Sequence, residues 1–177
     1  MKTAFTFLEV IELIPLPIFL FSSTLIDQRI PHDWLGPFMA GSLVALLTTT
    51  ILLYHQVLLN RLMVGINVYL VLGTIGLLTE HAWINQVYGT LKASGMLACI
   101  IIVGAVSLLV SPAGFIGITS PDRKMVTIFS FGLLLVSVLA FLLSFHFQGD
   151  RLYSELIPFL GLFAARKILQ SRMPKPT

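Results

Sequence analysis

The stretch that decides the fold is residues 61–111, which read RLMVGINVYLVLGTIGLLTEHAWINQVYGTLKASGMLACIIIVGAVSLLVS. It contains two apolar runs, Leu62–Thr79 and Leu91–Val110. Each is about as long as the ~20 residues that a helix needs to cross ~30 Å of hydrocarbon. The segment between the runs is polar and contains Trp83 and Tyr88, two side-chain types that are enriched at membrane interfaces. This pattern predicts two transmembrane helices joined as a hairpin by a polar link.

The composition of the whole chain indicates the same class of protein. Of its 177 residues, 56% are hydrophobic and 11% are charged, and the mean hydropathy is +0.94. A globular domain carries about 25% charged residues, and a disordered chain is poor in apolar ones. An outer-membrane barrel would alternate polar and apolar side chains, whereas the apolar runs here are continuous. We therefore expect an all-α fold, a polytopic transmembrane helical bundle that forms a single membrane domain.

The apolar runs predict about six membrane spans arranged as hairpins. Their predicted limits are 4–26, 35–54, 62–79, 91–110, 125–147 and 152–168, followed by a basic tail over 169–177. The first run contains Pro15 and Pro17, which a membrane helix tolerates when its neighbours satisfy the freed carbonyls. We interpret this run as one kinked helix. The alternative is a re-entrant first segment, which would leave five spans.

The basic residues separate onto the two sides of this six-span topology. The side that holds both termini has eight: Lys2, Arg61, Arg123, Lys124, Arg166, Lys167, Arg172 and Lys175. The opposite side has three: Arg29, Lys92 and Arg151. By the positive-inside rule, both termini are predicted to be cytoplasmic. The net charge of +3 therefore indicates orientation in a lipid bilayer rather than binding to nucleic acid.

Small side chains recur on one face of several predicted helices, where another helix can approach closely. They include Gly41, Ala45 and Thr49 in the second span and Ser130, Ser137 and Ser144 in the fifth. The first set repeats every four residues and the second every seven, so we expect both faces to pack against neighbouring helices.

A few ionisable and amide side chains inside the spans are candidates for a polar intramembrane site. They are Glu9, Glu12, Asn67, Lys92 and Glu155. An ionisable group at membrane depth is costly and is by default a functional candidate, for example for proton or cation handling. Alternatively, Glu9 and Glu12 lie in interfacial first turns, where a helix dipole and Lys2 or Arg61 would stabilise them. For Asn67, a bond to a neighbouring helix is the usual role.

No pattern typical of catalysis or cofactor binding occurs. The sequence lacks a Walker loop, a nucleophile elbow, an HExxH helix and a dinucleotide fingerprint. His32, His81 and His146 are predicted on the external side near carboxylates, but they lack the local spacing of a zinc site. The sequence therefore predicts no catalytic residue, no cofactor and no metal.

Three segments carry a family resemblance. Glu12–Pro15, Leu72–Leu78 and Tyr88–Lys92 read ELIP, LGTIGLL and YGTLK. Together they resemble the bacterial intracellular septation protein A family, over residues 5–25 and 61–111. The resemblance implies a small multi-pass protein of the cell inner membrane, linked to envelope synthesis and septation, without established catalytic residues.

Two functions from different classes fit these features. The first is a non-enzymatic membrane protein that acts through helix-mediated contacts in the cell envelope. Its partners would be the lipid bilayer and either a second copy or another membrane protein. The alternative is a small transporter or ion channel that uses the intramembrane glutamates. This alternative predicts that Glu9, Glu12, Lys92 or Glu155 approaches a shared polar cavity.

Overall fold

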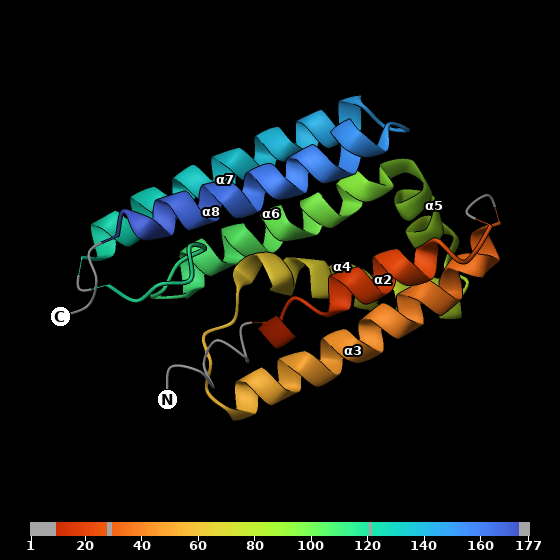
Figure 1. The fold of residues 1–177 in the computed structure, drawn as a ribbon, viewed down its shortest axis with the longest axis horizontal. Helices are drawn as coiled ribbons and strands as arrows, with labels where there is room; N and C mark the ends of the chain where they lie inside the picture. The colour runs from red at the N-terminus through yellow and green to blue at the C-terminus, as the bar shows by residue number, and fades with distance from the viewer. Residues whose placement is uncertain (1–9, 28–29, 121, 174–177) are drawn as a thin grey trace. The chain divides into compact units, whose positions relative to one another are not determined.

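The computed structural model describes residues 10–27, 30–120 and 122–173, and every regular element within these ranges is helical (Figure 1). In the first half of the chain the elements are α2 (Pro15–Ser23), the 3-10 helix η1 (Pro31–Trp34), α3 (Leu35–Tyr54), α4 (Arg61–Leu78) and α5 (Ala82–Leu91). In the second half they are α6 (Ala93–Val110), α7 (Arg123–His146), the π-helical turn η2 (Leu152–Leu156) and α8 (Ile157–Ser171). The predicted all-α class is confirmed.

Four helices in the described ranges are long and apolar enough to cross a membrane. They are His32–Tyr54, Arg61–Leu78, Ala93–Val110 and Arg123–His146. The helices α3, α4, α6 and α7 begin and end within about two residues of the predicted limits. The agreement has a physical cause, because an apolar run of this length can satisfy its backbone in hydrocarbon only as a helix.

The chain divides into two compact units, Met1–Thr90 and Leu91–Thr177. The helix α4 belongs to the first unit and α6 to the second.

In the first unit, α3 packs against both α2 and α4. A Cβ atom built at Gly41 would lie 3.1 Å from the Cβ of Phe19 and 3.2 Å from a methyl of Leu70, so the helices approach closely at this glycine. Ala45 is buried and Thr49 is half-buried on the same face. The prediction that this small-residue face packs against other helices is confirmed.

An aromatic cluster lies where the elements of the first unit meet. Its centre is Phe38 on α3, whose ring centroid lies 5.0 Å from that of Phe19 and 5.6 Å from those of Tyr69 and Tyr88. The rings of Tyr69 and Tyr88 stack at 4.7 Å. Gly73 of α4 lies against this cluster, since a Cβ atom there would overlap the ring of Phe38. The cluster joins α2, α3, α4 and α5.

The first apolar run was predicted to be one kinked helix, but its described part is interrupted by a turn. Residues 12–14 form a turn, and α2 begins after it with Pro15 in its first helical turn. Proline suits the first turn because its missing N–H would have no intrahelical partner there. Among the described residues, the run therefore contains a break before Pro15 and a helix of 9 residues.

The predicted polar link between α4 and α6 is largely the helix α5. Ile84 lies against Gly76, and the Tyr88 hydroxyl donates a hydrogen bond of 2.6 Å to the carbonyl of Tyr69. Side chains from two successive turns of α5 thus contact α4, at Gly76 and at Tyr69. Trp83 on the other side of α5 is 67% exposed.

In the second unit, α7 packs against both α6 and α8. The helices α7 and α8 run in opposite directions side by side (Figure 1). Ser130, Ser137 and Ser144 of α7 are all 0% exposed, which confirms that the heptad face packs inward. The predicted last span corresponds to η2 and α8 together, although α8 ends at Ser171 rather than at residue 168.

Candidate functional site

The Glu12 carboxylate lies at the start of α4. It is the most buried of the predicted site carboxylates that the structure describes. Glu12 is 7% exposed, and its carboxylate accepts a hydrogen bond of 2.5 Å from the N–H of Asn60. The Asn60 side chain in turn accepts a bond of 3.1 Å from the N–H of Leu62. Free N–H groups at a helix start favour a negative charge. The carboxylate is therefore stabilised by α4, not by the helix in which the sequence places it.

Asn67 ties α4 to α3. Its side-chain amide donates a bond of 3.1 Å to the hydroxyl of Thr49. The carbonyl oxygen of the same side chain is buried and has no hydrogen-bond donor among the described residues. One heptad further along α4, the Thr74 hydroxyl donates to Ser42 of α3 at 3.0 Å. As predicted, Asn67 bonds a neighbouring helix.

The other predicted site residues are placed as follows. Glu9 lies outside the described residues. Lys92 is exposed between α5 and α6 and has a φ of +49°, in the left-handed region. Glu155 is half-buried in η2. Glu12 bonds Asn60 at the start of α4, and Asn67 lies seven residues further along, about 10 Å on. The two side chains therefore make separate contacts.

The serines of α7 satisfy backbone groups of irregular segments. The Ser144 hydroxyl donates a bond of 2.6 Å to the carbonyl of Ser154 in η2. In a regular helix that carbonyl would accept from the N–H of residue 158, which is a proline and has none. At the other end of the stripe, the Ser130 hydroxyl accepts a bond of 3.1 Å from the N–H of Ile116.

The loop after α6, which lies between the predicted spans 91–110 and 125–147, is buried at its start. Ala113, Phe115 and Ile116 are at most 1% exposed. The carbonyl of Ile116 accepts a bond of 2.9 Å from the Gln170 side chain of α8. The ring of Phe115 lies over Gly104 of α6, where a Cβ atom would come within 2.9 Å of it. The signal that indicates this burial is the apolar content of residues 113–118.

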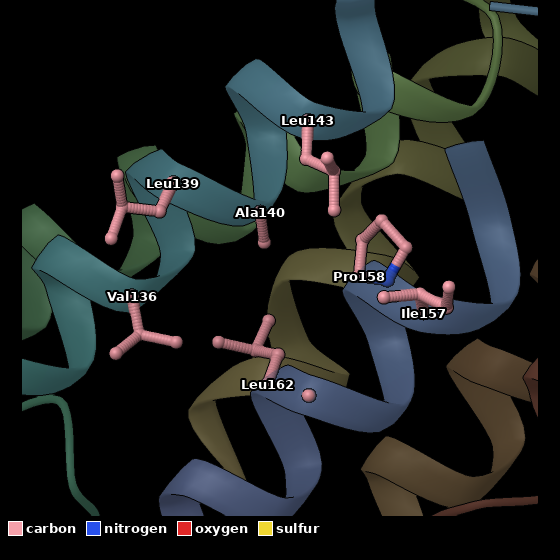
Figure 2. A pocket seen from close by; sticks show the side chains of 8 residues that line it. Val136, Leu139, Ala140, Leu143, Ile157, Pro158 and Leu162 are labelled. Carbon is pink, nitrogen blue, oxygen red and sulfur yellow. The ribbon is translucent and has the colours of Figure 1, made fainter. Parts of the chain in front are cut away.

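An apolar groove of about 220 Å³ runs between α7 and α8 (Figure 2). Four residues of α7 and four of α8 line it: Val136, Leu139, Ala140 and Leu143 from α7, and Ile157, Pro158, Gly161 and Leu162 from α8. Gly161 is exposed, and a Cβ atom built there has no neighbouring heavy atom within 4 Å. Sequence reasoning missed the groove because its two walls come from different helices.

Comparison with known proteins gives no assignment. No family model, curated protein or solved structure matches this chain. The resemblance to the septation family stays a prediction.

The chemistry of the described residues is that of helix packing. Inside each unit, the hydroxyl, amide and carboxylate groups described above bond to the backbone or to one another. No group of three His, Cys, Asp or Glu side chains in the described ranges could hold a metal ion. The side chains on the outer faces of α3 and α7 are mainly apolar. Examples are Leu43, Leu46, Leu47 and Ile51 on α3 and Ile128, Phe131, Leu135 and Leu142 on α7.

Proposed function

We propose that this chain is a non-enzymatic protein of the bacterial inner membrane that acts through contacts of its helix faces with envelope proteins. Its topology in this proposal has six crossings, with both termini in the cytoplasm. The eight-to-three separation of basic residues supports the orientation. The apolar outer faces support insertion in the bilayer, and the resemblance to the septation family supports the cellular role.

The observation that carries the proposal is the groove between α7 and α8. Helices in lipid associate by close packing, and small residues at the contact allow the backbones to approach. The exposed Gly161 is one of the residues that line the groove, and the other lining side chains are apolar. In this proposal, a transmembrane helix of a partner protein packs against the groove at Gly161.

The test is crosslinking in native membranes from a photoreactive residue at Leu160, which is 61% exposed beside the groove. We expect a discrete protein adduct, identified by mass spectrometry, whose yield falls at least about tenfold in Gly161→Leu because the new side chain fills the groove. The matched control is Gly132→Leu, at another glycine with no heavy atom within 4 Å of a built Cβ. Gly132 lies on α7 outside the groove, so this control should keep the adduct.

Two results would overturn the proposal. One is recovery of the protein alone, as a monomer, under conditions that preserve known envelope complexes. The other is an equal loss of adduct in Gly132→Leu and Gly161→Leu, which would mean that the groove is not the contact.

Ion or proton transport is a second candidate function, and the burial of Glu12 favours it. A carboxylate that is 7% exposed in an apolar run carries a desolvation cost that a proton- or cation-binding group would explain. Liposome flux measurements on the wild type and Glu12→Gln test this candidate. Proton or cation flux that Glu12→Gln abolishes would support it, whereas a well-incorporated wild type without flux would eliminate it.

A further inference from the structure

Exposed positive charge gathers at one end of the second unit. Gln170 at the end of α8 bonds Ile116, whose N–H bonds Ser130 near the start of α7. The start of α7 and the end of α8 therefore lie at the same end of the unit, as Figure 1 also shows. The exposed cations at this end are Arg123, Lys124, Lys167 and Arg172. An anionic group that approaches this end meets several positive charges.

A hollow lies at the first turns of α7, at this same end of the unit. The hollow has a volume of about 480 Å³ and is lined by Arg123, Lys124, Thr127 and Ile128. The nearby carboxylate of Asp122 accepts bonds from the backbone N–H groups of Lys124 at 3.0 Å and Met125 at 3.3 Å. Asp122 therefore caps the helix, and no described carboxylate forms a salt bridge with Arg123 or Lys124.

An exposed apolar stripe continues from the hollow along α7. Ile128 is 68% exposed, and Phe131 and Leu135 follow at helical spacing with more than half of their surface exposed. From Arg123 to Leu135 the helix rises about 18 Å. That length is close to half of the ~30 Å hydrocarbon core, which one acyl chain fills. The surface thus joins a cationic end to an apolar track about one leaflet long.

We propose that this surface binds an anionic phospholipid, with the phosphate at Arg123 and Lys124 and one acyl chain along Ile128, Phe131 and Leu135. Charge complementarity selects an anionic headgroup, and the stripe selects a lipid over a free phosphate or a nucleic acid. The inference requires only that the chain lies in a bilayer, so it does not depend on the protein partner proposed above.

The test is native mass spectrometry of the full chain released from detergent micelles that contain dioleoylphosphatidylglycerol or dioleoylphosphatidylcholine. We expect the wild type to retain phosphatidylglycerol preferentially. Each neutralised cation should weaken binding about fivefold, and Arg123→Gln with Lys124→Gln should weaken it roughly 25-fold. The matched control is Arg151→Gln, an exposed arginine of the same unit beyond the other end of α7, which should keep the wild-type affinity.

Two further measurements distinguish a lipid from a free phosphate as the ligand. Inorganic phosphate at millimolar concentration should not displace the lipid, because it cannot use the stripe, and Ile128→Ala should weaken lipid binding several-fold. Equal retention of the two lipids, an equal effect of Arg151→Gln, or displacement by inorganic phosphate would each overturn the proposal. Arg123 and Lys124 are exposed, so these variants should fold, and unchanged helical circular dichroism would verify that they do.

Discussion

Ser144 supplies a hydrogen bond to the Ser154 carbonyl, for which Pro158 cannot be the donor. Pro158 removes the donor that the Ser154 carbonyl would use, and the chain passes through the π-helical turn η2 at this point. An unsatisfied carbonyl in an apolar environment is costly. The hydroxyl of Ser144 on the neighbouring helix donates to this carbonyl and lowers that cost, so the hydrogen bond adds to the packing of η2 against α7.

Ser144→Ala should therefore destabilise the fold by about 1–2 kcal/mol, since it leaves the Ser154 carbonyl without this donor. The matched control is Ser137→Ala. Ser137 lies one heptad earlier and is equally buried, but its hydroxyl donates only to the Leu133 carbonyl of its own helix. The control should cost a few tenths of a kcal/mol. Unfolding by sodium dodecyl sulfate in mixed micelles measures both, and equal losses would show that burial alone matters.

At the residue scale, the sequence predicted which side chains face inward but not every residue that they bond. The heptad of Ser130, Ser137 and Ser144 predicted an inward face because side chains seven residues apart lie on one side of a helix. The bond from Asn60 to Glu12 joins residues 48 positions apart, and no local pattern indicates it. Contacts of this kind depend on how helices meet, which periodicity does not encode.

At the scale of elements, length and hydropathy predicted α3, α4, α6 and α7 but not α5. Residues 82–91 contain polar side chains, so hydropathy indicated a link. Ile84, Val87, Tyr88 and Leu91 nevertheless recur at helical spacing, and this is the signal that predicts an amphipathic helix. The burial of Phe115 and Ile116 was missed for a related reason, because glycines and Pro112 around them are typical of exposed loops.

Gly73 of α4 leaves room for the rings of Phe38 from α3 and Tyr88 from α5. In Gly73→Ala the new methyl would overlap the Phe38 ring and approach the Tyr88 ring to 2.8 Å. We expect the variant to lose about 1–3 kcal/mol of stability through overpacking. The control is Gly132→Ala on α7, where the space is open, and it should be neutral or gain up to about 1 kcal/mol from helix propensity. Thermal unfolding in detergent measures both, and an unchanged Gly73→Ala would contradict close packing at this cluster.

At the scale of the molecule, each compact unit contains two long apolar helices with shorter helices beside them. The segment Glu12–Pro15 has the same sequence, ELIP, as Glu155–Pro158. In both copies the proline lies in the first turn of a helix, α2 in the first unit and α8 in the second. Composition and span length predicted the class of the molecule because they depend only on transfer to hydrocarbon. The division after Thr90 depends on side-chain packing, so the apolar runs alone did not indicate it.

The last prediction concerns sidedness in the membrane. In a Cys99→Ala background, single cysteines at Gln86 and Gln148 should react with a membrane-impermeant maleimide added to intact cells. A cysteine at Arg172 should react only after permeabilisation, because in the proposed topology the eight-to-three separation of basic residues favours both termini in the cytoplasm. Arg172 is the suitable reporter because it is exposed, whereas Gln170 is half-buried and bonds Ile116. Reaction at Arg172 from outside would contradict the orientation. A cysteine at Gln28, outside the described residues, tests the first crossing: protection there while Gln86 and Gln148 react would reduce the topology to five spans.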